Sequence, residues 1–258
     1  MNILEQIIAF KREEVAARKI SLPLDILLQK ESINRKCFSL KDNLLMGTGT
    51  GIIAEFKRKS PSKGIINSNA DVLEITSGYT NNGAGGLSIL TDNHFFGGST
   101  EDLVVARQNN IPILRKDFII DDYQLYEAKT MGADVVLLIA ACLSIKKVKQ
   151  FAAVAKSLGM EVLLEIHDEA ELEHLCDETD MVGINNRNLK TFRVDIEQSI
   201  YLANKIPAQM LKISESGIGN TDMLKLLRNA GFNGFLIGEQ FMKEVNPVSA
   251  FEEFVSQI

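Results

Sequence analysis

From residue 50 onward the chain alternates short apolar runs with longer stretches in which apolar residues recur at helical spacing. The apolar runs start roughly 20 to 34 residues apart, a spacing that is typical of successive strand–helix units. They begin near Ile52, Gly86, Ile113, Asp134, Glu161, Met181, Leu211 and Gly234. Eight such units predict an α/β fold that closes into a (β/α)8 TIM barrel. The alternative is a doubly wound open sheet, which favours a glycine-rich fingerprint after its first strand, and KRKSPSKG is not one.

The stretches between the runs carry the signals of amphipathic helices. Val72, Ile75 and Tyr79 fall at i, i+3 and i+7, and a longer apolar stripe extends from residue 144 to residue 158. A glycine stands between such a stretch and the next strand at three places, Gly132, Gly159 and Gly231. Glycine is common where helices end, so the boundaries of these helices are also predicted.

The first 46 residues lie outside this repeat and are predicted to form a helical extension. Apolar positions cluster at residues 3–15, 22–28 and 38–45. We therefore divide the chain into an extension at residues 1–46 and a catalytic barrel at residues 47–258, which together form one structural domain. The extension can cap the bottom of the barrel, dock beside its mouth or mediate association, and the sequence leaves these alternatives open.

The segment at residues 52–64, IIAEFKRKSPSKG, ends its apolar run in an unusual group of charges. Because side chains alternate along a strand, Glu55 and Lys57 should share one face and Arg58 should lie on the other. Inside a barrel, an acid and an amine on the inner face would be partly desolvated at the mouth, and each would need a partner. The alternative is a solvated basic run. We assign that role to Arg58, and the role of Lys59 stays open.

The composition narrows the classes of function. With 45% apolar residues, 24% charged residues and a net charge of −6, the chain has no basic surplus that would favour nucleic acid or an anionic membrane as a partner. The first residues lack the long apolar core of a signal peptide, and no segment approaches the length of a membrane span. We therefore expect a cytoplasmic protein.

The cysteines and histidines show no metal-ligand spacing, so no metal site is predicted. They are Cys37, Cys142 and Cys176, and His94, His167 and His174. The cysteines are expected to be buried or incidental thiols. His167 and His174 lie seven residues apart, and each is expected to be exposed or to cap a helix.

Polar residues stand where the other predicted strands end. They are Lys116 in ILRKDF, Glu165 in VLLEI, Asn185 and Arg187 in GINNRNL, and Glu215 in ISESGI. Catalytic groups of such barrels lie at the carboxyl ends of the strands, so these side chains should share one mouth with Glu55 and Lys57. Any one of them alone could be a charge that reaches solvent. Together, lysines and glutamates in one mouth shift one another's pKa values and serve as general acids and bases.

The loops after the last two predicted strands have the composition of a phosphate cradle. Ser216 and Gly217 precede a helix that should begin near Asn220, and Gly238 and Glu239 precede the final helix. Glycine lets backbone amides approach a ligand, and these two loops commonly bind phosphate in this fold. The side chain of Glu239 should point away from a dianion while its amide serves the site; alternatively, this residue only starts a helix.

In the order of its motifs, the chain resembles the indole-3-glycerol-phosphate synthase family of tryptophan biosynthesis. The resemblance covers essentially the whole chain and rests on IIAEFKRKSPSKG, LSILTD with HFFGGS, ILRKDF, ADVVLLI, LLEIHDE, GINNRNL, SESGI and FLIGE. It implies that the substrate is 1-(2-carboxyphenylamino)-1-deoxyribulose 5-phosphate and that the products are indole-3-glycerol phosphate, carbon dioxide and water. It implies no metal and no organic cofactor.

The resemblance also implies roles in the reaction. Lys116 is the general acid of ring closure, in which a carbonyl oxygen gains a proton. Dehydration needs an acid for the departing hydroxyl and a base for the nitrogen-bound proton. Glu165 is the preferred base. Lys57 and Glu55 also take part in dehydration, and which of the three residues assists which proton transfer stays open.

The other matching residues position or bind the substrate. Asn185 is a positioning amide, Glu215 is the remaining carboxylate of the mouth, Arg187 holds the anilinic part or its carboxylate, and Ser60 helps fix the loop on the substrate side. The expected apolar walls are Phe96, Phe118, Leu137 and Leu189. The expected phosphate ligands are Ser216, Gly217, Gly238 and Glu239.

Two alternatives remain open. Another phosphosugar barrel, such as phosphoribosylanthranilate isomerase, shares the phosphate cradle but is not expected to carry two strand-end lysines with three glutamates. A barrel that only binds a phosphate ligand, or a partner through its extension, is disfavoured by Lys116, Glu165 and Lys57. The resemblance indicates a small phosphosugar-anthranilate substrate and a monomer or weak homo-oligomer.

Overall fold

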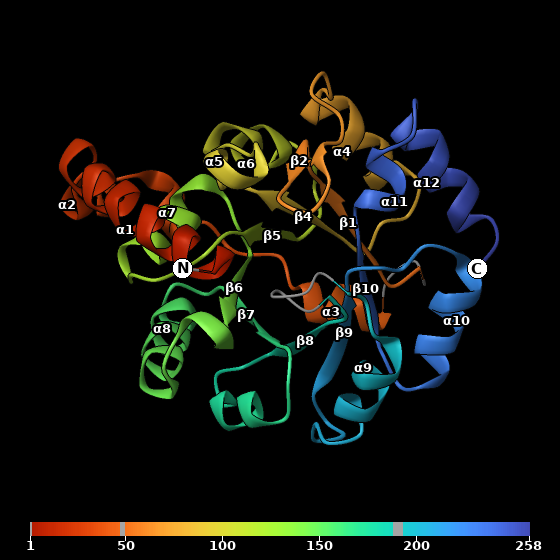
Figure 1. The fold of residues 1–258 in the computed structure, drawn as a ribbon. Helices are drawn as coiled ribbons and strands as arrows, with labels where there is room; N and C mark the ends of the chain where they lie inside the picture. Colours follow the sequence, from red (N-terminus) through yellow and green to blue (C-terminus); the bar gives the residue numbers. More distant parts are fainter. Residues whose placement is uncertain (1, 47–49, 188–192) are drawn as a thin grey trace.

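The computed structural model describes residues 2–46, 50–187 and 193–258, which form a closed barrel of parallel strands inside a ring of helices (Figure 1). Around the barrel the strands follow the order β1-β10-β9-β8-β7-β6-β5-β4. They are β1 Ile52–Phe56, β4 Gly86–Leu90, β5 Ile113–Lys116, β6 Val135–Ile139, β7 Glu161–Ile166, β8 Met181–Asn185, β9 Leu211–Glu215 and β10 Gly234–Ile237. Each begins within one residue of its predicted start, so the (β/α)8 TIM barrel is confirmed and the open-sheet alternative is wrong.

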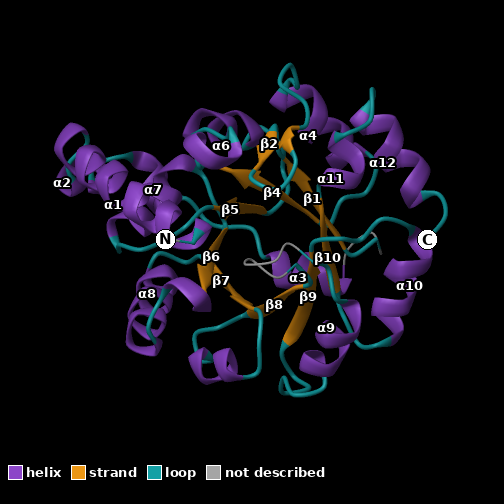
Figure 2. Ribbon diagram, viewed as in Figure 1, coloured by secondary structure: helices purple, strands orange, loops and turns teal. Residues whose placement is uncertain are grey.

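The helices cover the outside of the barrel and alternate with the strands along the chain (Figure 2). The longer ones are α4 Val72–Asn81, α6 Thr100–Ala106, α7 Tyr123–Met131, α8 Ile145–Ser157, α9 Ile196–Ala203, α10 Thr221–Asn229 and α12 Pro247–Val255. Short elements at the strand ends are the hairpin β2 Lys59–Ser60 with β3 Gly64–Ile65, α5 Asn93–Phe96, η2 Ala140–Cys142 and α11 Glu239–Met242. Between β7 and β8 the chain forms the 3₁₀ helix η3 Ala170–His174 in place of a full α-helix.

Local signals explain where the helices begin and end. Asn220 precedes α10 as predicted, and its side chain accepts the backbone N–H of Met223. Ser144 caps α8 in the same way. Gly132 ends α7 with a φ of 104°, in the left-handed region that glycine adopts without a steric penalty. The apolar stripes predicted for α4 and α8 face the barrel and are buried.

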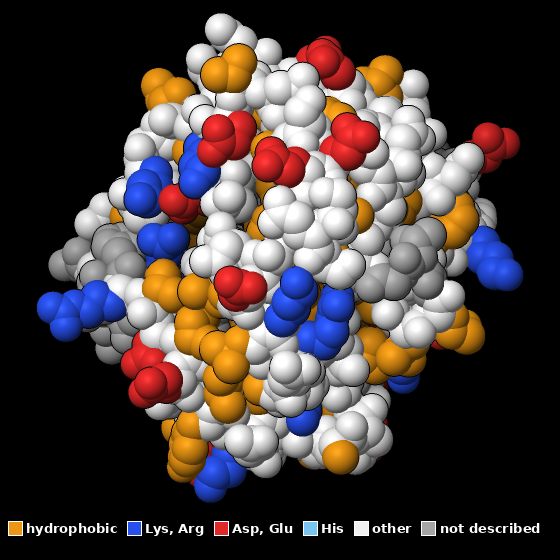
Figure 3. All heavy atoms as spheres, turned by 90° about the vertical axis from the view of Figure 1, so that its right-hand side faces the viewer, with side chains coloured by type: hydrophobic (Ala, Val, Ile, Leu, Met, Phe, Trp, Pro, Cys, Tyr) orange, Lys and Arg blue, Asp and Glu red, His pale blue; other side chains and the backbone are white. Residues whose placement is uncertain are grey.

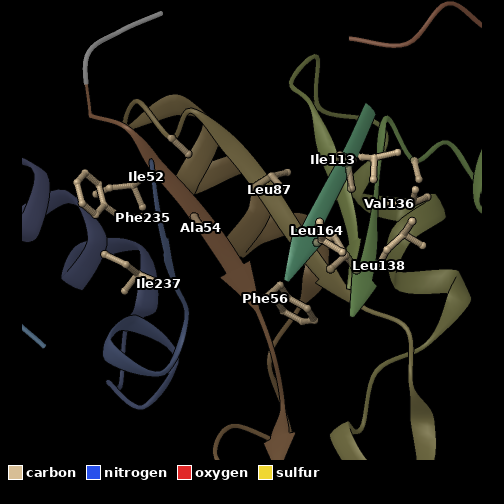
Figure 4. Packing of buried hydrophobic residues seen from close by; sticks show 14 of the residues in the cluster. Ile52, Ala54, Phe56, Leu87, Ile113, Val136, Leu138, Leu164, Phe235 and Ile237 are labelled. Atoms are coloured by element: carbon tan, nitrogen blue, oxygen red, sulfur yellow. The ribbon is translucent and has the colours of Figure 1, made fainter. Parts of the chain in front are cut away.

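The strands separate an outer apolar core from an inner one. In the outer core, side chains such as Ala54, Val136 and Leu164 face the helices (Figure 4). In the inner core, Ile53 and Leu163 are packed with other residues inside the barrel. The predicted alternation along β1 is therefore confirmed. Because of the same alternation, Glu55 and Lys57, two and four residues after Ile53, also face inward, at the mouth.

The amino-terminal residues form α1 Ile3–Ser21, α2 Leu24–Leu28, η1 Glu31–Asn34 and α3 Leu40–Met46. Helix α3 closes the amino end of the barrel, because Leu40 belongs to the inner core. A Cβ atom at Gly86, where β4 starts, would come within 2.5 Å of the Leu40 side chain. Glycine at this position therefore leaves space for Leu40 of α3. A domain boundary at residue 46 remains a prediction.

Helix α1 is fastened to the side of the barrel by buried charges. The Lys11 side chain is only 1% exposed, and its Nζ atom lies 2.8 Å from Glu14 Oε2. The same nitrogen lies 2.9 Å from Asp92 Oδ2 and 2.9 Å from Asp117 Oδ1. Asp92 follows β4 and Asp117 follows β5, so Lys11 ties α1 to two loops at the mouth.

Two arginines extend this network into what we call the charge ring, made of Lys11, Glu14, Arg18, Glu127, Arg115 and Asp117. Arg18 pairs with Glu14 and with Glu127 on α7. Arg115, which is fully buried, pairs with Glu127 and Asp117. Cations and anions alternate around the ring, so every buried charge has opposite charges as neighbours.

The outer surface mixes charges of both signs. On the face formed by the helices at the right of Figure 1, acidic, basic and apolar side chains are scattered among one another (Figure 3). Among the described residues, no helix combines the length and the apolar character needed to cross a membrane.

Candidate active site

A cavity of about 380 Å³ opens at the carboxyl ends of the strands, between the β2–β3 hairpin, the start of α1 and the loops before α10 and α11. All the predicted site residues that the structure describes line it: Glu55, Lys57, Ser60, Phe96, Lys116, Phe118, Leu137, Glu165, Asn185, Arg187, Glu215, Ser216, Gly217, Gly238 and Glu239. Leu189 was also predicted, but it lies outside the described residues. The candidates thus share one cavity, and their individual roles stay predictions.

Lys116 lies between two carboxylates. Its Nζ atom is 2.9 Å from Glu165 Oε2 on β7 and 3.1 Å from Glu215 Oε2 on β9. The Lys116 side chain is 16% exposed, and both carboxylates are almost completely buried. Because little water screens these charges, the ammonium interacts strongly with both partners.

Burial and mutual attraction set the pKa values of this group. Burial alone would lower the pKa of Lys116, but Glu165, Glu215 and Glu55 outweigh it and raise the pKa above its usual value. Burial would raise the pKa of Glu165, but Lys116 and His167 hold it well below its usual range. At Glu215 burial dominates over the attraction of Lys116 and raises the pKa to about 7. Near neutral pH the site therefore holds an ammonium, a carboxylate and a carboxyl group close to its midpoint.

A second ion pair comes from β1 and the residue that follows it. Lys57 Nζ lies 2.7 Å from Glu55 Oε1, which confirms that these two side chains share a face. Gly238 stands against this pair, because a Cβ atom there would lie 2.7 Å from Glu55 Oε1. Glycine at this position therefore leaves space for Glu55. This packing role is independent of the predicted phosphate contact of the Gly238 amide.

Strand β8 holds the two carboxylates next to Lys116 in place. Asn185 donates a hydrogen bond from Nδ2 to Glu165 Oε1 at 3.0 Å, and its Oδ1 accepts the backbone N–H of Arg187 at 3.0 Å. Gly183 lies against Glu215, and a Cβ atom at this glycine would collide with Glu215 Oε1. Asn185 therefore orients Glu165, and Gly183 leaves the space that Glu215 fills.

The loop after β9 has a strained backbone of a kind that is common at ligand sites. Ser216 has a φ of 70° and Gly217 a φ of 73°, and Ser216 is the one non-glycine residue with a positive φ in the described part of the chain. Asn186 braces this turn by donating from Nδ2 to the carbonyl oxygen of Ser216 at 2.7 Å. Surrounding structure must maintain such a conformation, so the geometry supports a functional loop.

The residue that starts α11 does not behave as predicted. The carboxylate of Glu239 was expected to point away from the site. Instead, its Oε1 lies 3.5 Å from Lys63 Nζ, and its Oε2 lies 3.4 Å from Nη2 of Arg187, which lines the cavity. The expectation failed because two cations from other loops neutralise the carboxylate and hold it at the rim.

Apolar side chains complete the lining. Phe96 at the end of α5 and Phe118 after β5 have ring centroids 6.0 Å apart. Ile3 and Ile7 of α1 also line the cavity, and they were not among the predicted site residues. The amphipathic pattern of α1 predicted an apolar face, but nothing in it indicated that part of this face would cover the mouth.

Two residues that were assigned to solvent are partly buried and lie against partners. Arg58 Nη1 lies 2.5 Å from Asp102 Oδ2 on α6, and its guanidinium lies 4.7 Å from the centre of the Phe56 ring. The side chain of His167 is 14% exposed and stands beside Glu165. The predictions of a solvated Arg58 and of an exposed or capping His167 are therefore wrong.

Asp92 and Asp117 line the cavity as well and were missed. Asp92 lies two residues after β4, at LTD, and Asp117 directly follows β5, at RKD, so the signal that indicated Lys116 and Glu165 could also have found them. Within the described residues, no group of three or more His, Cys, Asp or Glu side chains is arranged to hold a metal ion.

The fold and the site define a class of protein. This is a (β/α)8-barrel enzyme whose mouth carries paired ammonium and carboxylate groups, an apolar wall and a glycine-containing loop suited to an anion.

The family model described as indole-3-glycerol phosphate synthase matches residues 4–254. A relative from Bacteroides thetaiotaomicron with that description is 50% identical over 259 residues, which cover 100% of this chain and 99% of the relative. Another, from Polaromonas sp., is 44% identical over 251 residues and 95% of both chains. The chain therefore belongs to the indole-3-glycerol phosphate synthase family, and the predicted family is confirmed.

Solved structures of lower identity have the same fold. Tryptophan synthase subunit alpha from Legionella pneumophila matches with a TM-score of 0.61 and 12% identity, over 84% of this chain and 94% of that one. KGPDC from Streptococcus mutans matches with a TM-score of 0.59 and 14% identity, over 80% of this chain and 97% of that one. At such identities the likeness supports the barrel fold alone.

Proposed function

We propose that this chain catalyses the reaction for which its family is named, in tryptophan biosynthesis. The reaction is ring closure, decarboxylation and dehydration of 1-(2-carboxyphenylamino)-1-deoxyribulose 5-phosphate to indole-3-glycerol phosphate. The observation that carries the proposal is the position of Lys116 between Glu165 and Glu215 at the mouth. The second pair, Lys57 with Glu55, supplies groups for a further proton transfer.

In ring closure the aromatic carbon that bears the carboxylate attacks the ketone, and the ketone oxygen must gain a proton. Lys116 is the acid, because its raised pKa keeps it an ammonium at neutral pH. Glu215, with a pKa of about 7, lies 3.1 Å from Lys116 and returns a proton to it. Carbon dioxide then leaves, and the electrons of the broken bond neutralise the iminium that closure produced.

Dehydration removes the hydroxyl as water and a proton from the methylene carbon next to nitrogen, because the nitrogen keeps its proton in the indole product. Glu165 is the base in this proposal. Lys116 and His167 hold the pKa of Glu165 below its usual range, so Glu165 is a carboxylate at neutral pH and can accept a proton. Lys57, held by Glu55, is the candidate acid for the hydroxyl.

The charges around the cavity orient the substrate. The phosphate dianion fits the backbone amides of Gly217 and Gly238. Arg187 lies 3.4 Å from Glu239, the residue next to Gly238, so we assign Arg187 to the phosphate and not to the anilinic carboxylate. The aromatic ring then packs against the apolar part of the lining.

Incubating the purified protein with the carboxyphenylamino substrate tests the function. We expect the fluorescence of the indole product to appear, and also in buffer that contains a metal chelator. Phosphoribosylanthranilate, supplied in a parallel reaction, should remain unchanged. No indole signal at high enzyme concentration would refute the proposed activity, and turnover of phosphoribosylanthranilate would favour the isomerase.

Inorganic phosphate tests the assignment of Arg187. We expect phosphate to inhibit competitively, and Arg187→Gln should raise both KM and the inhibition constant of phosphate by roughly 10-fold, because a charge-assisted contact is lost. Arg12→Gln, an exposed change on α1, is the matched control. If Arg187→Gln instead weakened inhibition by anthranilate and left phosphate unaffected, Arg187 would belong to the anilinic end.

We further propose that the protein works in the cytoplasm as a monomer or weak homo-oligomer without a nucleic-acid partner. The net charge of −6 and the mixed charges in Figure 3 support the last point. The cytoplasmic location is supported by the proposed substrate, which is a small phosphorylated metabolite. Recovery with the membrane fraction, or light scattering that finds a stable oligomer at low concentration, would contradict the proposal.

A further inference from the structure

His167 is a partly buried histidine that the proposed reaction does not use. It directly follows β7, and its side chain is 14% exposed. Nε2 lies 3.3 Å from Glu165 Oε1, and Nδ1 lies 3.5 Å from Glu171 Oε2 on η3. Neither ring nitrogen makes a hydrogen bond in the described part of the chain. The interaction of the imidazole with the two carboxylates is therefore mainly electrostatic.

Both carboxylates beside this ring are themselves fixed. Glu171 Oε2 accepts the backbone N–H of His167 at 2.6 Å. Glu165 binds Lys116 through Oε2 and accepts from Asn185 at Oε1, the oxygen that also faces the imidazole. Glu165 also lines the cavity, so the histidine adds a third neighbour to this carboxylate beside Lys116 and Asn185.

The charged and titratable groups around His167 are mostly acidic. They are Glu165 on β7, Glu171 on η3, Glu215 on β9 and Cys142 on η2, and Lys116 lies beyond Glu165. Burial would lower the pKa of His167, but Glu171, Glu165 and Glu215 outweigh it and raise the pKa above the usual value. Burial together with Glu165 and Glu171 raises the pKa of the Cys142 thiol to about 12, so Cys142 stays neutral. The surroundings thus favour an imidazolium.

We propose that His167 is a positioning residue for Glu165, whose protonated ring bridges Glu165 to Glu171 and keeps the Glu165 carboxylate turned toward Lys116. This proposal rests on the proposed role of Glu165 as a base. Below the pKa of His167 the bridge is intact. As the pH rises through that raised value, the ring loses its charge and Glu165 loses one of its anchors, so turnover should fall on the alkaline side.

Proton NMR of the imidazole resonances tests the bridge without an activity assay. The chain has three histidines, so His167→Gln, together with His174→Gln, assigns all the signals. We expect His167 to titrate above the usual value of histidine, and Glu165→Gln or Glu171→Gln should each lower its midpoint by roughly one pH unit. A midpoint that neither substitution moves would overturn the bridge.

Kinetics test the consequence for Glu165. Gln cannot carry a charge, so His167→Gln should lower kcat by about 10-fold, leave KM within about twofold, and remove the alkaline transition that follows the NMR midpoint. His174→Gln is the matched control, because among the described residues the ring nitrogens of His174 lie within hydrogen-bond distance of two backbone carbonyl oxygens, those of Glu171 and Leu143, and of no carboxylate. An unchanged kcat and pH profile in His167→Gln would overturn the positioning role. A fully active Glu165→Gln with the NMR shift intact would instead refute the proposed base.

Discussion

Replacing Lys116 by alanine should lower kcat by about 10³-fold while substrate binding stays within roughly threefold of the parent, because general acids act in the transition state. Lys116 is the only cation that pairs with both Glu165 and Glu215 in the described residues. Without it, these two carboxylates repel each other inside a buried site, so at least one should bind a proton near neutral pH. Single-turnover fluorescence and substrate titration measure the two effects separately.

Lys149→Ala is the matched control for this experiment, because Lys149 is an exposed lysine on α8. It should leave kcat and binding unchanged. Far-UV circular dichroism of Lys116→Ala checks that the barrel is intact. A Lys116→Ala variant as active as the parent would remove the proposed acid, and a variant that folds but no longer binds substrate would make Lys116 a binding residue.

Replacing Lys11 by methionine should destabilise the protein by about 3–5 kcal/mol, because it leaves the buried Asp92 without the cation it pairs with and takes one of two cations from Asp117. Lys11 is 1% exposed and contacts Glu14, Asp92 and Asp117. For a chain of this length, that loss should lower Tm by roughly 10 °C. KM should also rise several-fold, since α1 carries Ile3 and Ile7 into the cavity lining.

Urea denaturation and thermal scans measure the change in stability, and steady-state kinetics measure KM. Arg12→Met is the control, because Arg12 is the exposed neighbour of Lys11 on the same helix. It should change the free energy of unfolding by less than about 0.5 kcal/mol. If Lys11→Met proved as stable as Arg12→Met, the charge ring would not fasten α1 to the barrel.

Much of the site could be predicted because strand alternation and strand order are enough to assemble it. Glu55, Lys116 and Glu165 end different strands on inward positions, and a closed parallel barrel brings all such positions to one mouth. The predictions were wrong for two charged residues that lie beyond the strand ends. Arg58 and Glu239 are surface-like charges in the sequence, and their partners Asp102 and Arg187 lie 44 and 52 residues away.

By itself the sequence determined the eight strands, the helices between them, the family and the group of lysines and glutamates at the mouth. These follow from periodicity, capping and motif order, which act over a few residues. The tertiary structure alone decided that α3 closes the bottom while α1 lines the mouth, and that a buried Lys11 and a partly buried His167 lie among carboxylates. Such choices depend on which distant groups meet when the barrel closes, because a buried charge is stable only beside a partner that the local sequence does not contain.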